Sequence, residues 1–294
     1  MRSIGAYLAL GIFWLMHWLP LPVLRASAGV FGHLLFYCAR SRKHVGRVNL
    51  RLCFPAATEA WREALLRRHF VLFTQAAFDR AKMFWSPLAT ITDMTRIIGM
   101  DELLRLEGEP VILMGIHNVG LEFGGVGIAL RLQTPLSLIY SVQSNPVINK
   151  AMVKGRGRFN HSILFERQHP LRGVVKTLRQ GHPLCYFPDQ DFGPRDSIFL
   201  PFFGVPAATI TGTSRLARMA GARIVPVVTR LTPRGYDIEL FPAWENFPSD
   251  SLAADALRIN AFIEEQVLQA PEQYFWLHKR FKTRPPGEAD FYAR

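Results

Sequence analysis

A short apolar run that ends in a histidine limits what this chain can fold into. The run Ile112–Ile116 leads directly into His117, and Glu122 follows at the start of a Gly-rich, helix-like segment. Uninterrupted apolar residues over four to eight positions, bounded by turn signals, are typical of a buried strand. Ligands in open α/β sheets bind beyond the carboxyl ends of the strands. His117 therefore occupies the position where the chemistry of such a sheet is normally found.

The spacing between His117 and Glu122 restricts how the two side chains can meet. Five residues on one ideal helix leave side chains about 140° apart. The pair can face each other only if His117 lies in the turn before the helix and Glu122 in its first turn. We then expect the carboxylate to bind one imidazole nitrogen and leave the other as a base. The spacing alone is weakly specific, and a hydrogen-bonded core histidine remains the alternative.

From about Gly108 onward, short apolar runs alternate with amphipathic stretches. This alternation predicts an α/β fold with parallel βαβ units, in which helices cover both faces of a mostly parallel central sheet. Gly181 and Gly221 stand where C-terminal helix glycines belong. The nucleotide-binding patterns GxGxxG and GxxxxGK[ST] are absent from the sequence, which argues against a nucleotide enzyme. The expected strands are 111–116, 136–140, 163–165, 184–187 and 224–229, and the expected helices are 120–131, 146–155, 171–180, 212–220 and 252–268.

The N-terminal residues form an uncharged apolar run from Ile4 to Leu24. The run is long enough to span a bilayer, and it lacks the cleavage site and strongly basic start of a secretory signal peptide. Pro20 and Pro22 allow a second interpretation, a kinked segment that lies in the membrane interface. A buried helix of a soluble protein is the third.

Charge is distributed unevenly along the chain, whose formal net charge is +12. No Asp or Glu precedes Glu59, and basic residues crowd between 40 and 51. Such an excess is typical of the cytoplasmic flank of a membrane segment and attracts anionic headgroups. We therefore predict three parts: a membrane anchor at 1–25, a helical membrane-proximal extension at 26–107 and an α/β domain at 108–294. Helical spacing over 58–85, with Thr58 as a cap, predicts one long helix in the extension.

Three further stretches place polar groups where a sheet protein would hold a site. Residues 150–158 crowd four cations at a Gly-loosened helix end, and arginine forks suit phosphate and carboxylate groups. Residues 165–167 put a charge pair at a strand end. Residues 186–195 follow another strand and contain two carboxylates and an arginine in a loop that is stiffened by Pro and Gly. A solvated basic face and an ordinary Asx-turn loop are the respective alternatives for the first and third stretches. The candidate substrate-binding residues are Arg156, Arg158, Arg167, Asp189, Asp191 and Arg195.

These segments together resemble the lipid A late acyltransferases of Gram-negative bacteria, a branch of the glycerolipid acyltransferases with a His-x4-acid signature. The matching motifs are His117-Asn-Val-Gly-Leu-Glu122, the block 188–203 and the block 270–285. The two long blocks are far more specific than the first motif, and the similarity runs over the whole chain. The resemblance implies an enzyme of the bacterial inner membrane with its active site on the cytoplasmic side. It would move an acyl chain from acyl carrier protein onto the 3-hydroxyl of an acyl chain on a phosphorylated lipid A precursor.

We expect His117 to act as the general base and Glu122 to orient its imidazole. Arg158 or the backbone N–H groups of Val119 and Gly120 are candidate donors to the oxyanion. The predicted arginines would bind acceptor phosphates, and the two aspartates would order them. No metal-ligand cluster stands out, and no cofactor is expected. The expected partners are acyl carrier protein, the lipid A precursor and inner-membrane lipids, with no nucleic acid.

Two other functions remain open from the residues alone. Another membrane glycerolipid or mannoside acyltransferase would share the chemistry and differ in its acceptor. A non-catalytic protein that binds anionic lipid would use the same cations, with His117 as a structural residue. Consumption of the donor thioester separates the enzyme from the binding protein.

Overall fold

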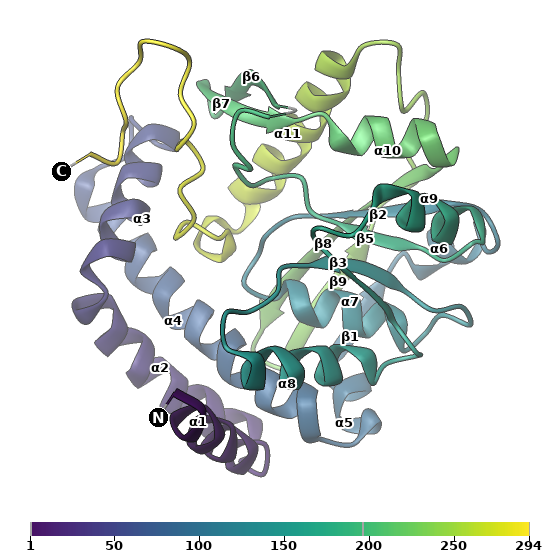
Figure 1. Cartoon of the computed structure of the whole chain (residues 1–294). Coiled ribbons are helices and arrows are strands. Elements are labelled where there is room, and N and C mark those ends of the chain that lie inside the picture. Colours follow the sequence, from purple (N-terminus) through teal and green to yellow (C-terminus); the bar gives the residue numbers. More distant parts are fainter. Residues whose placement is uncertain (1, 196, 294) are drawn as a thin grey trace.

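A seven-stranded sheet forms the centre of the molecule in the computed structural model, which describes residues 2–195 and 197–293 (Figure 1). The strand order is β1-β9-β8-β2-β5-β3-β4, and every pair is parallel except β8 with β9. A separate antiparallel hairpin pairs β6 with β7. The strands are β1 Thr95–Ile98, β2 Val111–Gly115, β3 Ser137–Tyr140, β4 Ile163–Glu166, β5 Leu184–Tyr186, β6 Ser197–Phe202, β7 Val205–Ile210, β8 Arg223–Thr232 and β9 Gly235–Leu240.

Helices cover both faces of this sheet, because successive residues of its buried strands point to opposite sides. In β2, Ile112 belongs to a core cluster shared with α9, α10 and α11, whereas Leu113 packs with Phe123 of α7. The predicted mostly parallel sheet with two covered faces is confirmed. The helices are α1 Arg2–Met16, α2 Leu21–Cys38, α3 Arg40–Cys53, α4 Glu59–Trp85, α5 Leu88–Asp93, α6 Met100–Leu104, α7 Leu121–Ala129, α8 Pro146–Gly157, α9 Leu171–Arg179, α10 Gly212–Ala220 and α11 Leu252–Gln269, followed by the 3₁₀ turn Pro271–Gln273.

Each predicted strand and each predicted helix is present within a few residues of its expected ends. Thr58 caps α4 as predicted, because its hydroxyl accepts a hydrogen bond from the amide of Trp61 at 3.2 Å. The strands β1, β6, β7 and β9 were not predicted. β1 is a four-residue edge strand, and β9 alternates charged with apolar residues, so neither forms the apolar run that marks a buried strand.

The N-terminal apolar run is two helices, which corrects the expectation of one continuous segment from Ile4 to Leu24. The chain leaves α1 after Met16 and starts α2 at Leu21, with Pro20 and Pro22 at the new N-terminus. Proline suits the first turn of a helix, where its missing N–H is not needed, and it disrupts a helix interior. Among the described helices, α2 has the length and composition to cross a membrane.

The structure packs α2 along α4, and one side of α2 is buried there. Leu24, Arg25, Ala28, Gly32 and Phe36 form this buried stripe. A Cβ atom on Gly32 would stand 2.7 Å from the Cα of Val71, so the two backbones approach too closely for any other residue. The helices α1 to α4 therefore make one N-terminal arm, which flanks the α/β body in Figure 1.

The outward sides of α1 and α2 are strongly apolar. Tyr7, Leu8 and Ile12 of α1 are more than half exposed, as are Phe31 and Leu34 of α2. Water-exposed apolar patches of this extent mark interaction surfaces. We refer to the exposed sides of α1 and α2 as the apolar arm surface.

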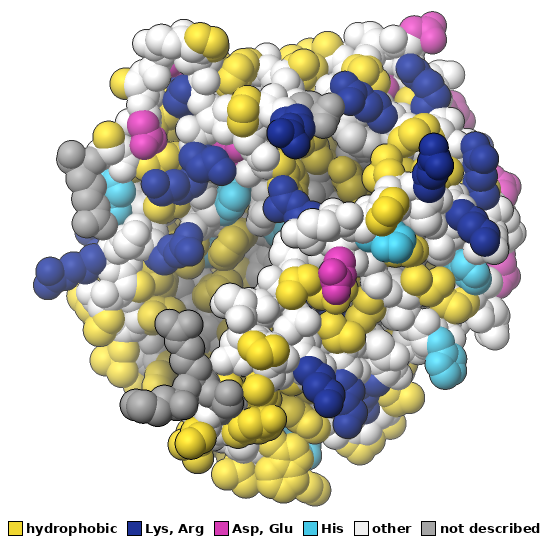
Figure 2. Space-filling view, in the orientation of Figure 1, with side chains coloured by type: hydrophobic (Ala, Val, Ile, Leu, Met, Phe, Trp, Pro, Cys, Tyr) yellow, Lys and Arg dark blue, Asp and Glu magenta, His cyan; other side chains and the backbone are white. Residues whose placement is uncertain are grey.

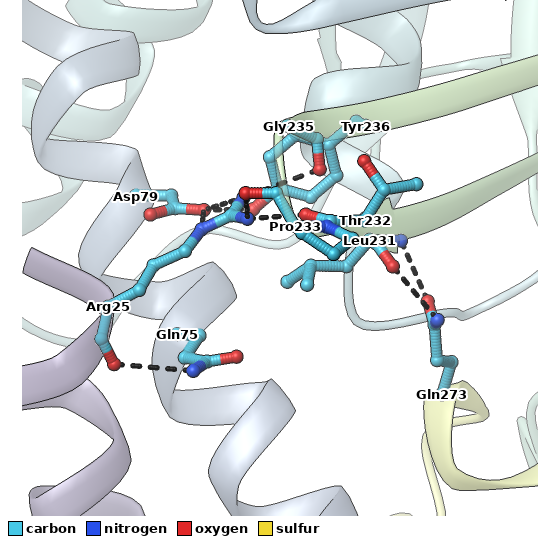
Figure 3. A network of polar contacts seen from close by, with 9 residues as sticks. All are labelled: Arg25, Gln75, Asp79, Leu231, Thr232, Pro233, Gly235, Tyr236 and Gln273. Carbon is cyan, nitrogen blue, oxygen red and sulfur yellow. Dashed lines mark hydrogen bonds and ion pairs between the residues drawn. The ribbon is translucent and has the colours of Figure 1, made fainter. Parts of the chain in front are cut away.

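A buried ion pair joins the arm to the body (Figure 3). The guanidinium of Arg25 lies 2.7 Å from a carboxylate oxygen of Asp79 on α4, and both side chains are almost fully buried. Arg25 also donates to the carbonyl oxygens of Thr232 at 2.5 Å and Gly235 at 3.3 Å in the β8–β9 turn. The hydroxyl of Tyr236 donates to the same Asp79 oxygen at 2.7 Å. This network fixes α2 and α4 relative to the sheet.

Replacing Asp79 with Ala should destabilise the protein by about 3–5 kcal/mol, because it leaves the Arg25 guanidinium buried without its counter-charge. Denaturant unfolding of the detergent-solubilised protein measures this change. Asp237→Ala, which breaks the exposed pair with Arg96, is the matched control and should have a much smaller effect. Equal effects of the two substitutions would contradict a structural role of the buried network.

Candidate functional site

A cavity of about 1040 Å³ opens at the carboxyl ends of β2, β3 and β5. Figure 2 shows the molecule hollowed here, between the arm and the α/β body. His117 after β2, Ser141 after β3 and Gln190 after β5 all line the cavity. Parallel strands bring their carboxyl ends to one edge, so the cavity lies where the fold is expected to hold a ligand.

His117 is held by Asp189, which follows β5, the strand beside β2 in the sheet. The Nδ1 atom of His117 lies 2.5 Å from one carboxylate oxygen of Asp189, and the His117 amide donates to the other oxygen at 2.8 Å. Burial would raise the pKa of the Asp189 carboxyl, but the contact with His117 outweighs it and the pKa is lowered. An ionised carboxylate can only accept a hydrogen bond, so Nδ1 of His117 carries the proton and donates it to Asp189. The Nε2 atom of the imidazole, which lines the cavity, is then free to accept a proton.

Glu122 has different partners, which corrects the expectation that it orients the imidazole. Its carboxylate forms a two-point contact with the Arg156 guanidinium, in which the Arg156 Nε donates at 3.0 Å, and Arg80 lies 3.7 Å away. Burial would raise the pKa of Glu122, but the two arginines outweigh it and lower the pKa. Glu122 lies in the first turn of α7, as expected, so the position was predicted and the contact was not.

Arg156 and Arg158 serve different purposes. Arg156 lines the cavity beside Glu122. Arg158 instead donates to the carbonyl oxygens of Met83 at 3.1 Å and Ser86 at 2.7 Å, at the C-terminus of α4. Carbonyls at a helix end lack partners within the helix, and a cation satisfies them well. The expected role of Arg158 in binding substrate or oxyanion is therefore corrected to a structural link between α8 and α4.

Asp191 is also structural, which corrects the expectation that it orders the arginines. Its carboxylate accepts hydrogen bonds from the backbone and hydroxyl of Thr283 at 2.6 and 2.8 Å, and from the Gly193 amide at 2.8 Å. The Asp191 amide donates to Nε2 of His278 at 3.1 Å. The loop after β5 is thus fastened to the C-terminal segment.

The same C-terminal segment fixes the loop that carries His117. Phe275 donates its amide to the His117 carbonyl oxygen at 2.9 Å, and the Val119 amide donates to the Gln273 carbonyl oxygen at 2.9 Å. The Val119 amide is therefore used structurally and is not available as the predicted oxyanion donor. No spacing within residues 117–122 could have indicated this contact, because its partner lies more than 150 positions later in the chain.

The charged lining of the cavity is mainly positive. Arg167 lies over the ring of Phe192, with 4.6 Å between its guanidinium carbon and the ring centre. Arg80, contributed by α4, was not predicted, because its helix reads as a packing helix. The charged side chains of the described lining are Glu122, Arg80, Arg156, Arg167, Arg195 and Arg215.

One part of the cavity is apolar. This part is lined by Val126 and Ala129 of α7, by Leu136 and Leu138 at β3, and by Phe159 after α8. An apolar pocket beside a basic lining suits a ligand that combines a hydrocarbon chain with anionic groups. Among the described residues, no three His, Cys, Asp or Glu side chains converge to hold a metal ion.

The burial of His278 makes fold stability sensitive to acid. Burial, with the nearby positive charges, lowers the pKa of His278 from 6.5 to about 4. The unfolded chain therefore binds a proton at His278 that the folded chain does not, so this contribution to stability is complete above pH 6.5 and is lost as the pH falls towards 4.

The melting temperature of His278→Gln should therefore fall less steeply from pH 6.5 to pH 4 than the melting temperature of the wild type does. Thermal unfolding in detergent over this range measures the slope. His33→Gln on the exposed side of α2 is the control and should keep the wild-type slope. If His278→Gln kept the wild-type slope, protonation of His278 would not be the cause of the loss of stability in acid.

The chain is similar to a known protein family over nearly its whole length. The family model described as bacterial lipid A biosynthesis acyltransferase matches residues 1–283. The chain is 36% identical to a lipid A biosynthesis lauroyltransferase of Escherichia coli (strain K12), over 96% of this chain and 92% of that protein. It is 33% identical to the palmitoleoyltransferase of the same strain, over 97% and 94% of the two chains. The corresponding values for the myristoyltransferase are 31%, 93% and 84%.

A more distant likeness is to the crystal structure of the 1-acyl-sn-glycerophosphate acyltransferase PlsC from Thermotoga maritima. The identity is 15% and the TM-score 0.39, over 92% of this chain and 99% of that one. The match to the family model and the near full-length identity to its members are decisive. This chain belongs to the bacterial lipid A biosynthesis acyltransferases.

Proposed function

We propose that the protein transfers a fatty acyl chain from acyl carrier protein to a hydroxyl group on an acyl chain of a phosphorylated lipid A precursor. The observation that carries this proposal is the His117–Asp189 pair at the head of a cavity with an apolar part and a basic lining. The apolar part accepts hydrocarbon, and the arginines match phosphate groups. Membership of the lipid A family favours this acceptor over a glycerolipid or mannoside.

His117 acts as a general base. Its Nε2 removes the proton of the acceptor hydroxyl as that oxygen attacks the thioester carbonyl carbon. The tetrahedral intermediate collapses, the carbon–sulfur bond breaks, and the imidazolium returns the proton to the departing thiolate. The products are an ester and the free thiol of the carrier. Asp189 holds the ring in the required tautomer and stabilises its positive charge.

The oxyanion of the intermediate requires hydrogen-bond donors. Arg158 and the Val119 amide donate to backbone carbonyl groups. Of the predicted donors, the Gly120 amide remains, at the N-terminus of α7, where the helix dipole favours negative charge. We assign the oxyanion to this end of α7.

Glu122 contributes indirectly. Its carboxylate holds the Arg156 fork and attracts Arg80, so that both guanidinium groups have fixed positions in the cavity lining. A bidentate contact orients an arginine far better than solvent does. We propose that these two arginines, with Arg167 and Arg195, bind the phosphates or acidic sugar of the acceptor.

The apolar arm surface brings this site to the membrane. One side of α2 is packed on α4 and its outward side is apolar, as in a helix that lies within an interface. We propose that the arm is embedded in the cytoplasmic side of the inner membrane and delivers the lipid acceptor to the cavity. The cations of α3 strengthen this contact only in part, because Arg47 and Arg51 pair with Glu63 and Glu59.

Mass spectrometry of lipid A, from cells that lack late acylation, tests the proposed reaction. Expression of the wild-type protein should add the mass of one fatty acyl residue, and expression of His117→Ala at an equal membrane level should not. New acyl groups on glycerolipids, with lipid A unchanged, would contradict the proposed acceptor. Mass gain with the His117→Ala protein would contradict the proposed base.

A further inference from the structure

The helices α9 and α10 pack against each other and carry a segregated positive charge. No Asp or Glu occurs in the sequence between Glu166 and Asp189, where α9 lies, or between Asp196 and Asp237, where α10 lies. Figure 2 shows Lys and Arg side chains gathered over these two helices. The α9–α10 face consists of the exposed side chains Arg172, Lys176, Arg179, Arg215 and Arg218, with Leu171 and Met219.

The charges of Arg179 and Arg218 are not cancelled by the contacts that these two side chains make. Arg179 donates to the carbonyl oxygen of Met219 at 2.6 Å, and Arg218 donates to that of Ser249 at 2.5 Å. Carbonyl partners are neutral, so they orient the guanidinium groups and leave the positive charge in place. A concentrated field of one sign attracts a partner of the opposite sign and accelerates its encounter.

The cavity reaches this face. Leu171 at the start of α9 and Met219 of α10 line the cavity and are 48% and 41% exposed. Arg215 also lines the cavity and is exposed. A ligand that sits on the face can therefore extend a flexible arm between the two helices towards His117.

A lipid surface fits this face poorly. Its exposed large apolar side chains are Leu171 and Met219, whereas α1 and α2 together expose a long series of them. In Figure 2 the apolar side chains gather at the lower edge, over the end of α1, away from the cations over α9 and α10. The arm side therefore suits the membrane, and the α9–α10 face suits a soluble anion.

We propose that the α9–α10 face is the docking surface for the acyl carrier protein. This inference rests on the proposed function, which requires an acidic carrier with its acyl thioester on a phosphate-linked arm. Acidic side chains of the carrier lie against Arg172, Lys176 and Arg218, and the arm enters beside Leu171 and Arg215. The acceptor then approaches from the arm side, so donor and acceptor reach His117 from different directions.

The test is steady-state kinetics of Arg172→Glu/Lys176→Glu in detergent micelles. These side chains lie four residues apart on one helix, as Lys150 and Lys154 do on α8, so Lys150→Glu/Lys154→Glu is a control with the same change of charge. Each protein is assayed with an acyl carrier protein thioester and with the same acyl group on pantetheine alone.

The α9 variant should raise KM for the carrier thioester by about tenfold or more and leave kcat within about twofold. Its kinetics with acyl pantetheine should match the wild type. The difference in KM should shrink as salt rises towards 1 M, where charges are screened beyond about 3 Å. The milder variant Arg172→Gln/Lys176→Gln should give an intermediate KM. It replaces the charge-reversal variant in the assay if charge reversal impairs folding.

Three outcomes overturn the docking surface: an equal rise in KM with the α8 control, an equal loss with acyl pantetheine, or an unchanged KM for the carrier thioester. Loss of binding to phosphatidylglycerol vesicles without a change in that KM would assign the face to lipid. If acyl carrier protein were not the donor at all, the result would be different, because the wild-type protein itself would not turn over the carrier thioester.

Discussion

The contact between the Asp189 carboxylate and His117 is the interaction on which the site depends. One oxygen binds the imidazole and the other binds the His117 amide, so a single side chain fixes both the ring and its backbone. The two residues follow neighbouring parallel strands, β2 and β5, and the order of the sheet brings them together. The C-terminal segment closes the arrangement, because it bonds to the backbone of the His117 loop and to Asp191.

The N-terminal arm is connected to this site through buried contacts. Arg25 and Asp79 hold the β8–β9 turn and Tyr236, whose ring stacks on Phe123 with 4.1 Å between ring centres. Phe123 follows Glu122 in α7. These contacts therefore fix the positions of the apolar arm surface, the Glu122 carboxylate and the sheet relative to one another. A buried ion pair rarely adds much net stability over an apolar substitute. Its value here is a defined orientation of the membrane-facing arm relative to the cavity.

Local patterns in the sequence predicted the sheet core, α4 and the helices from α7 to α11, because apolar runs, periodicity and terminal glycines act over a few residues. The predicted position of His117 was right, since it rests on the strand-end rule. The partners were wrong for Glu122, Arg158 and Asp191, because ion pairs and helix-end contacts depend on segments far apart in the chain. Asp189 was predicted to order the arginines, whereas its carboxylate binds His117. Its place after a strand adjacent to β2 was the available signal, and using it required the strand order.

Turnover of His117→Ala, Asp189→Asn and Glu122→Gln, and of the double variants that combine His117→Ala with each of the other two, tests the central claim most directly. The account predicts that His117→Ala lowers kcat by roughly 10²–10⁴. Asp189→Asn should lower kcat strongly as well. The His117→Ala/Asp189→Asn double variant should be little worse than His117→Ala, because residues that act as one unit are non-additive. Glu122→Gln should combine additively with His117→Ala. Near-normal turnover of Asp189→Asn, together with non-additivity between Glu122 and His117, would contradict the assignment of Asp189 as the partner of the base.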